Sequence, residues 1–302
     1  MALLSGLICL WYKFDIKIFA DDETFAAIFA SNRQKLNKKY ESVMKKHHFL
    51  LGIAMVGLSV AMSSCVNCYR SLSFSEKDMV TETRHLKDFE RIEVNGSPTV
   101  YYTQADSFSV VVKAPEDVID EILTEKEGST LIVRNRGKMG MVNVSFNDGA
   151  DMSIYVTSPD LTSVRLNGSG DFVSRELIDT DNMEFVLRGS GDIDVQDVVC
   201  DRCRVEVVGS GDLDVKNLES RNVSVTLVGS GDIDLNLHRV NDTNIGLRGS
   251  GDINVNFNND CGSVDCQLNG SGDINLSGRV SRFHMEKHGS GDIDIDNLSI
   301  EK

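Results

Sequence analysis

In the second half of the chain, apolar and polar residues alternate in short runs on both sides of a recurring Gly-Ser-Gly-Asp tetrapeptide. In one unit, Val205 and Val207 precede the tetrapeptide that starts at Gly209, and Leu213 and Val215 follow it. Alternation with a period of two is typical of strands with one buried face, and glycine between two such runs indicates a tight turn. Each unit is therefore predicted to be a strand, a turn, a second strand and a looser return.

The tetrapeptide recurs seven times, at intervals of 19 to 21 residues. One unit cannot bury its own apolar face, but stacked units bury a continuous core. The sequence therefore predicts an all-β fold, a right-handed, single-stranded parallel β-helix (a solenoid) with coils of about 20 residues, because parallel crossovers are right-handed by default. The structural turns are expected at paired glycines, which are Gly168 and Gly170, Gly189 and Gly191, Gly209 and Gly211, Gly229 and Gly231, Gly249 and Gly251, Gly270 and Gly272, and Gly289 and Gly291.

A degenerate copy of the unit lies at residues 92–102, where Pro98 replaces the second glycine. It falls within residues 86–166, which we expect to form an irregular N-terminal capping section, because the terminal units of a solenoid must cover its core. Residues 167–302 hold the exact repeats and complete a predicted solenoid head domain over residues 86–302. The elements expected in the capping section are a short helix or turn at Glu116–Leu123 and strands at Ser109–Lys113, Thr130–Arg134, Met141–Phe146 and Met152–Thr157.

A targeting pattern precedes the repeats. A Lys-Lys-His-His run is followed by an uncharged apolar segment and then by Met62-Ser63-Ser64-Cys65. This order is typical of a bacterial lipoprotein signal peptide, in which the cysteine is lipidated. We therefore predict a signal peptide over residues 44–64, lipidation of Cys65 and a lipidated tether over residues 65–85. The alternative is an ordinary secretory signal with an incidental cysteine.

Residues 1–43 do not fit this plan, because a signal peptide normally starts at the N-terminus. Met44 immediately precedes the two lysines. We therefore expect translation to start at Met44 and treat residues 1–43 as a doubtful N-terminal extension.

Composition excludes some classes of protein. Hydrophobic residues make up 41% of the chain, which provides for a sizeable core and excludes wholesale disorder. The formal net charge is −15, from 31 basic and 46 acidic residues. A surface this acidic repels phosphate backbones, so no nucleic-acid partner is expected.

The aspartates of the repeat form two predicted columns of carboxylates. One column contains the fourth residue of each tetrapeptide, and the other lies two residues later. Carboxylates on strands about 4.8 Å apart repel one another unless they are hydrated, hydrogen-bonded or bridged by cations. Turn capping is the structural interpretation, and calcium is the alternative cofactor because it prefers oxygen ligands. The residues proposed for calcium are Asp192, Asp212, Asp232 and Asp252 in the first column and Asp194, Asp214 and Asp234 in the second.

The same equivalence argues against catalysis, since a glycosidase needs two carboxylates in unlike environments. We therefore assign no catalytic residue and no other cofactor.

Cys200-x2-Cys203 and Cys261-x4-Cys266 have a superficial likeness to a zinc site. Cys200 and Cys261 are three coils apart, roughly 14 Å at the strand spacing, whereas zinc–sulfur bonds are about 2.3 Å long. Buried thiols are expected, with local disulfides as the alternative.

The lipoprotein-type leader, the degenerate glycine turn in Ile92-x-Val94-x-Gly96 followed by Val100-Tyr101, and the GSGD repeats together resemble the head GIN domain family of auto-transporter adhesins found in Bacteroides-type bacteria. The resemblance covers residues 86–302. It implies a β-helix similar in shape to pectin lyases but without their catalytic residues. It also implies a role in adhesion and, by analogy within the family, a homotrimer.

The sequence thus predicts an exported, lipid-anchored β-helical binding or structural module, adhesin-like and not an enzyme. The expected partners are the membrane, through the lipid, and a host or envelope glycan or protein. The expected location is the cell envelope, as an outer-membrane lipoprotein facing the periplasm or the surface. The alternatives are a carbohydrate-active enzyme, either a polysaccharide lyase or a hydrolase of pectin-lyase-like fold, and a periplasmic envelope component that binds protein.

Overall fold

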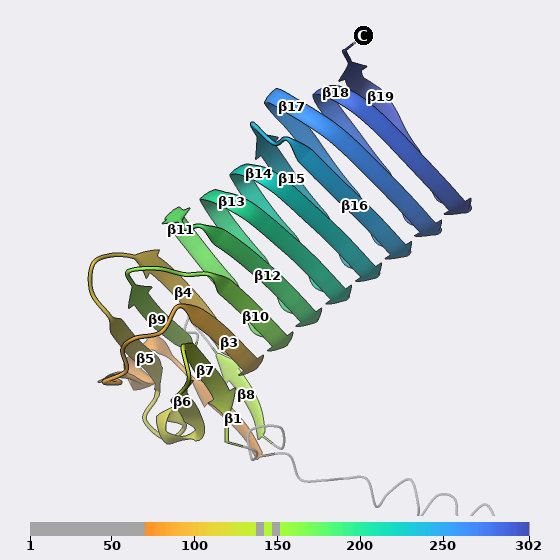
Figure 1. The fold of residues 1–302 in the computed structure, drawn as a ribbon. Coiled ribbons are helices and arrows are strands. Elements are labelled where there is room, and N and C mark those ends of the chain that lie inside the picture. Colours follow the sequence, from red (N-terminus) through yellow and green to blue (C-terminus); the bar gives the residue numbers. More distant parts are fainter. Residues whose placement is uncertain (1–69, 137–141, 147–151, 302) are drawn as a thin grey trace, which may run out of the picture. The chain divides into compact units, whose positions relative to one another are not determined.

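The structure is a computed structural model that describes residues 70–136, 142–146 and 152–301. The predicted signal peptide and Cys65 lie outside these residues. The described chain is nearly all-β and winds into a solenoid of about seven turns with roughly 20 residues each, which confirms the predicted fold class (Figure 1). No helix within the described ranges is long and apolar enough to span a membrane.

Each coil contributes to two parallel sheets that meet at the glycine turn. The pre-turn sheet runs through β3 (Arg91–Gly96), β10 (Ser163–Gly168), β12 (Asn182–Gly189), the second halves of β13 (Ile193–Gly209) and β14 (Leu213–Gly229), β16 (Asp242–Gly249), and the second halves of β17 (Ile253–Gly270) and β18 (Ile274–Gly289). The post-turn sheet runs through β4 (Thr99–Gln104), β11 (Phe172–Asp179), the first halves of β13 and β14, β15 (Ile233–His238), the first halves of β17 and β18, and β19 (Ile293–Ile300).

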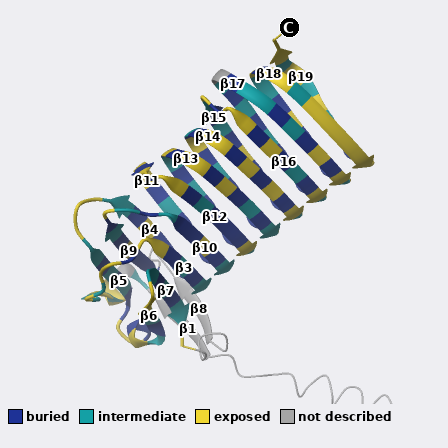
Figure 2. Ribbon diagram, viewed as in Figure 1, coloured by how far each residue is buried: buried dark blue, intermediate teal, exposed yellow. Residues whose placement is uncertain are grey.

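The coils are stacked in register. Gly189 lies opposite Gly209, and Gly209 lies opposite Gly229. Because each coil repeats the same apolar alternation, equivalent residues face inward in every turn. Val205 and Leu213, on the two sides of one glycine turn, are at most 1% exposed. Figure 2 shows the result as buried and exposed positions that alternate along each strand.

The degenerate copy at residues 92–102 is the first regular coil, as predicted. In β3, Gly96 lies opposite Gly168 of β10, and in β4, Val100 lies opposite Phe172 of β11. β7 (Thr130–Asn135) and β9 (Ser153–Ser158) continue the two sheets beyond this coil as further parallel strands.

Antiparallel strands then cover the N-terminal end of the stack. β6 (Ile122–Glu127) pairs with β7, β5 (Ser109–Pro115) pairs with β9, and β2 (Met79–Thr83) pairs with β5. The change from parallel to antiparallel pairing ends the solenoid pattern at these strands.

The short helix or turn expected at Glu116–Leu123 is present as a turn and a 3-10 helix at Ile119–Glu121 (η2), after which β6 begins at Ile122. One other local expectation in the N-terminal section differs from the structure. The expected tether over residues 65–85 is wrong for its second half, which forms β1 (Arg70–Phe74), a 3-10 turn at Glu76–Asp78 (η1) and β2. β1 pairs with β8 (Val142–Phe146). β2 and β6 are polar sequences that become strands through backbone pairing with a neighbour, which apolar alternation does not reveal.

Candidate functional site

The first glycine of each tetrapeptide turns the chain at the corner between the two sheets. Its φ lies between +131° and +153° in all seven copies, in a region that side chains rarely adopt. Space is also lacking, because a Cβ atom on Gly209 would lie 2.1 Å from the carbonyl oxygen of Gly189. Both backbone conformation and close approach therefore require glycine at this position.

The second glycine is required for close approach alone. Gly231 does not have a positive φ, yet a Cβ atom there would lie 2.0 Å from the carbonyl oxygen of Gly211 in the preceding coil. The corner is therefore a column of backbones in contact from coil to coil.

The first aspartate column links neighbouring coils. The backbone N–H of Asp212 donates to Oδ1 of Asp192 at 3.1 Å, and that of Asp232 donates to Oδ1 of Asp212 at 2.8 Å. The same contact, at 2.7 to 3.0 Å, joins Asp192 to Asp171, Asp252 to Asp232, Asp273 to Asp252 and Asp292 to Asp273. The carboxylates thus cap the next coil's turn, where a local turn within each coil was the expectation.

These contacts use carboxylate oxygens that calcium would need. In the part of the chain that the structure describes, no group of three or more His, Cys, Asp or Glu side chains lies close enough to hold a metal ion. Calcium binding by the aspartate columns therefore stays a prediction from ligand chemistry, because the described residues form no cluster that favours it.

The second aspartate column is one part of a longer file of outward-facing side chains on the post-turn sheet, which we call the post-turn row. Strand register places its members side by side from the cap to the last coil. They are Val111, Tyr155, Tyr101, Val173, Asp194, Asp214, Asp234, Asn254, Asn275 and Asp294.

The polar half of this row is bonded internally. Arg175 forms an ion pair with Asp194 at 2.6 Å, and Lys216 pairs with Asp214. The amide of Asn254 donates to Oδ1 of Asp234 at 2.8 Å, and the next amide along the row continues the ladder. A shallow hollow of about 320 Å³ lies over this end, lined by Asp234, Asn236, Asn254, Asn256 and Asn275 among others. The polar half of the post-turn row therefore presents amides and ion-paired side chains and is not a column of unpaired carboxylates.

The other half of the row is aromatic. The rings of Tyr101 and Tyr155 stack with centroids 5.4 Å apart and planes inclined by 18°. Their exposed fractions are 36% and 44%, while the following residues, Tyr102 and Val156, are buried. The sequence-based site assignments missed this pair. The signal was present in the alternation, since an inward Tyr102 requires Tyr101 to point outward.

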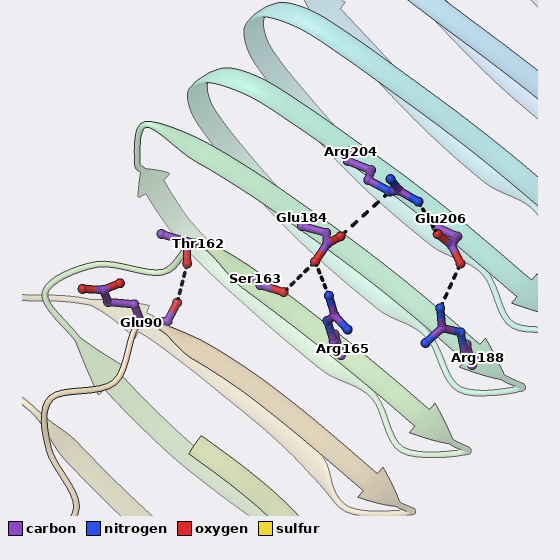
Figure 3. Close-up of polar contacts among 8 residues, drawn as sticks. All are labelled: Glu90, Thr162, Ser163, Arg165, Glu184, Arg188, Arg204 and Glu206. Carbon is purple, nitrogen blue, oxygen red and sulfur yellow. Dashed lines mark hydrogen bonds and ion pairs between the residues drawn. The ribbon is translucent and has the colours of Figure 1, made fainter. Parts of the chain in front are cut away.

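The pre-turn sheet carries a network of alternating charges near its N-terminal end (Figure 3). Arg165 donates to Oε2 of Glu184 at 2.7 Å, and the Ser163 hydroxyl lies 3.2 Å from the same oxygen. Arg204 lies 3.8 Å from the other oxygen of Glu184. A hollow of about 560 Å³ lies beside this network, lined by Arg91, Glu93, Thr130, Arg165, Asn182 and Glu184 among others.

The network continues to Glu206, which accepts from Arg204 at 2.7 Å and from Arg188 at 3.0 Å. The hydrogen bond from Arg204 is the main reason that the pKa of Glu206 lies below its usual value, and Arg188 adds to the effect. Glu184 and Glu206 each have an arginine partner on an adjacent strand, so the network joins neighbouring coils.

The described cysteines Cys200, Cys203, Cys261 and Cys266 are buried, and Cys200, Cys203 and Cys266 are free thiols. Hydrogen bonding with Cys200, together with burial, raises the pKa of Cys203. Burial raises the pKa of Cys266 to about 12. Cys200 and Cys203 lie on β13 and Cys261 and Cys266 on β17, and these four described residues do not form a shared metal site.

Comparison with known proteins agrees with this geometry. A crystal structure of a "putative adhesin" from Bacteroides fragilis superposes with a TM-score of 0.63 at 25% identity, over 73% of this chain and 98% of that one. A "putative lipid binding protein" from Parabacteroides distasonis gives 0.56 at 22% identity, over 76% and 100%. A "putative adhesin" from Parabacteroides merdae gives 0.56 at 14% identity, over 77% and 100%. No curated protein matches the chain.

The match in sequence is to one family model, which begins just before β3 and extends through every coil. It covers residues 88–263 and 256–302, well over half of the chain. The resemblance noted from the glycine turns is thereby confirmed, and the chain belongs to the family described as "Putative auto-transporter adhesin, head GIN domain".

Proposed function

We propose that this protein is an exported, lipid-anchored binding module of adhesin type at the cell envelope. The observation that carries the proposal is the post-turn row, an unbroken file of outward side chains that crosses the sheet from cap to last coil. A rigid, extended face of this kind suits recognition of an extended ligand. Family membership and the Met62-Ser63-Ser64-Cys65 leader sequence support the adhesin role and the lipid anchor.

The alternative of a carbohydrate-active enzyme has less support. A glycosidase requires two carboxyl groups whose surroundings push their pKa values apart. The aspartates of the first column all make the same contact with the next coil, so their surroundings are alike. On the pre-turn sheet, the hydrogen bond from Arg204 lowers the pKa of Glu206, and Glu184 forms an ion pair with Arg165. Binding therefore fits this surface better than catalysis.

Lipid anchoring is tested by metabolic labelling with an alkyne fatty acid. Cys65→Ser should abolish incorporation and release the protein from membranes, while Cys68→Ser should leave both unchanged. Label that persists in Cys65→Ser, or membrane release by both variants, would contradict the anchor.

Exposure at the cell surface is tested by protease shaving of intact cells, with a known periplasmic protein as control. Degradation of this chain with the control intact supports the adhesin. Protection of both supports the alternative of a periplasmic component that binds protein. A crosslinking experiment on the same cells would test the homotrimer that the family analogy implies.

A further inference from the structure

We infer that the stacked tyrosine pair of the post-turn row is a binding platform for a neutral glycan. The inference rests on the proposed function as a binding module and adds the class of ligand and the residues that contact it.

The tyrosine pair offers exposed aromatic surface to a sugar ring. β4 and β9 lie side by side at the N-terminal end of the stack (Figure 1), and Tyr101 on β4 is paired with Tyr155 on β9. Their nearly parallel rings leave more than a third of each side chain exposed. Val111 and Val173 continue the apolar surface on both sides. A pyranose ring has an apolar C–H face, and flat aromatic rings bury such a face at low entropic cost.

Hydrogen-bonding groups surround the aromatic surface. Thr103 and Thr157 are two residues beyond the tyrosines on the same two strands, face the same way and lie opposite each other. Ser109 is paired with Thr157 on the next strand. Hydroxyl groups both donate and accept, which suits the hydroxyls at the edge of a sugar. An apolar platform with a few convergent polar groups is the general form of a small-molecule site.

The net charge of the chain selects against acidic sugars. Further along the row, Asp194 and Asp214 are balanced by Arg175 and Lys216. Beyond them, Asp234 has an amide as its partner, and the whole chain carries a net charge of −15. A polyuronate would meet this field with like charge, whereas a neutral glycan would bind across the amides and hydroxyls without that cost.

A protein partner fits this surface less well. Stable protein interfaces bury about 1,200 Å² or more around a central cluster of fully desolvated anchors. Here the exposed aromatic surface is one pair of tyrosines, and threonine, serine and ion-paired side chains lie around it. A narrow aromatic strip within a straight polar row matches a chain of sugar units.

The test is a glycan array probed with the purified protein, followed by calorimetry with the array's strongest neutral and acidic oligosaccharides. The key variant is the double substitution Tyr101→Ala and Tyr155→Ala. The matched control is Leu177→Ala, which truncates another exposed apolar side chain (48% exposed) outside the row. A second control, Tyr101→Phe with Tyr155→Phe, keeps the rings. Melting curves of all variants establish that they are folded.

We expect neutral glycans to bind, and the double alanine variant to bind them at least about tenfold more weakly, the equivalent of losing one aromatic stacking contact. The two control variants should bind within about twofold of the unchanged protein. Three results would overturn the inference: no glycan retained, equal retention by the double alanine variant, or a preference for acidic glycans. Binding to a mucin that persists after its enzymatic deglycosylation would assign the platform to a protein partner instead.

This test is independent of the test of location. Protection from shaving together with glycan binding would contradict the adhesin and leave the platform in place. Surface exposure without glycan binding would contradict only the platform.

Discussion

Each glycine turn contains two glycines that are needed for different reasons. The first, such as Gly209, combines a positive φ with close contact to the coil before it, whereas the second, such as Gly231, has only the contact. Because the contact is with backbone, which cannot move aside as a flexible side chain would, a single methyl group must displace a whole coil. The repeated tetrapeptide is thus a steric requirement of stacking.

We predict that Gly231→Ala lowers the free energy of unfolding by about 3 kcal/mol, the cost of forcing a Cβ atom into a closed contact. Gly246→Ala is the matched control, because a Cβ atom there would lie 4.0 Å from the Val225 carbonyl oxygen, an ordinary contact distance. Gly246→Ala should change the free energy of unfolding by less than about 0.5 kcal/mol. Alanine also lowers the entropy of the unfolded chain, which favours the folded state. Urea unfolding followed by circular dichroism measures both, and equal effects would contradict the contact argument.

The aspartate column predicts a contrast between amide and alanine. Oδ1 of Asp212 accepts the backbone N–H of Asp232 at 2.8 Å. Asp212→Asn keeps an acceptor oxygen and should cost little, whereas Asp212→Ala should cost about 1 kcal/mol, the net value of one hydrogen bond. Urea unfolding of the two variants provides the comparison. If calcium were bound by this column, melting temperatures would instead rise with calcium and fall with chelator, and Asp212→Asn would reduce that shift.

At the scale of the element, a buried polar contact joins the first regular coil to β9. Tyr102 on β4 is 2% exposed, and its hydroxyl lies 3.1 Å from the Ser158 hydroxyl on β9. Burial is the main cause that raises the pKa of Tyr102 to about 12, and the negative charge of Asp160 adds to it. The folded protein therefore holds the phenolic proton more tightly than the unfolded chain, whose tyrosines titrate near pH 10.

This difference predicts how stability depends on pH. The contribution of Tyr102 is fully present below about pH 10 and is lost as pH rises toward about 12, by roughly 2 kcal/mol. Tyr102→Phe should cost about 1 kcal/mol at pH 8, where it removes a hydrogen bond. At pH 11 that cost should shrink, because the variant has no proton to lose. Urea unfolding at both values tests this, with the exposed Tyr155→Phe as control; a constant cost for Tyr102→Phe would contradict the prediction.

The elements that could be predicted from sequence are those in which alternation and repeat agree. Val205, Val207, Leu213 and Val215 mark two strands around one turn, and the same spacing extends to Ile92 and Val100 in the degenerate copy. β2 and β6 were missed because an antiparallel edge strand is stabilised by its partner's backbone and needs no apolar period of its own.

The site was less predictable than the fold for a similar reason. Tyr101 and Tyr155 are 54 positions apart, and no local pattern indicates that they are neighbours. The β4–β9 pairing brings them together, after an excursion through four other strands. By contrast, the aspartate columns follow from a fixed repeat length, although the sequence did not show that each carboxylate caps the next coil.

At the scale of the molecule, the solenoid is an array of coils that contact only their neighbours. Stability in such an array is close to a sum of coil and interface contributions. Because Gly209 and Gly229 occupy equivalent positions, the chain can be shortened by one full coil without moving any inward residue to the outside.

We predict that deletion of residues 209–228 gives a folded protein with a β-sheet spectrum and cooperative unfolding, and with a smaller denaturant dependence because less surface is exposed on unfolding. Deletion of residues 219–228 removes half a coil and should prevent folding, because the pre-turn strand of that coil is lost. Circular dichroism and urea unfolding distinguish the two. Equal behaviour of both deletions would contradict a neighbour-only array.

The long excursion between the first two regular coils has a consequence for how the molecule assembles. Gly96 and Gly168 are adjacent in the stack but 72 positions apart along the chain, whereas Gly209 and Gly229 are 20 apart. Closing the longer loop costs about 1 kcal/mol more in chain entropy. Contacts between coils near in sequence therefore form at lower entropic cost, so nucleation is favoured among the C-terminal coils. On the ribosome the N-terminal part emerges first. β3 of the first coil can pair with β10 only after Ser163–Gly168 has been synthesised.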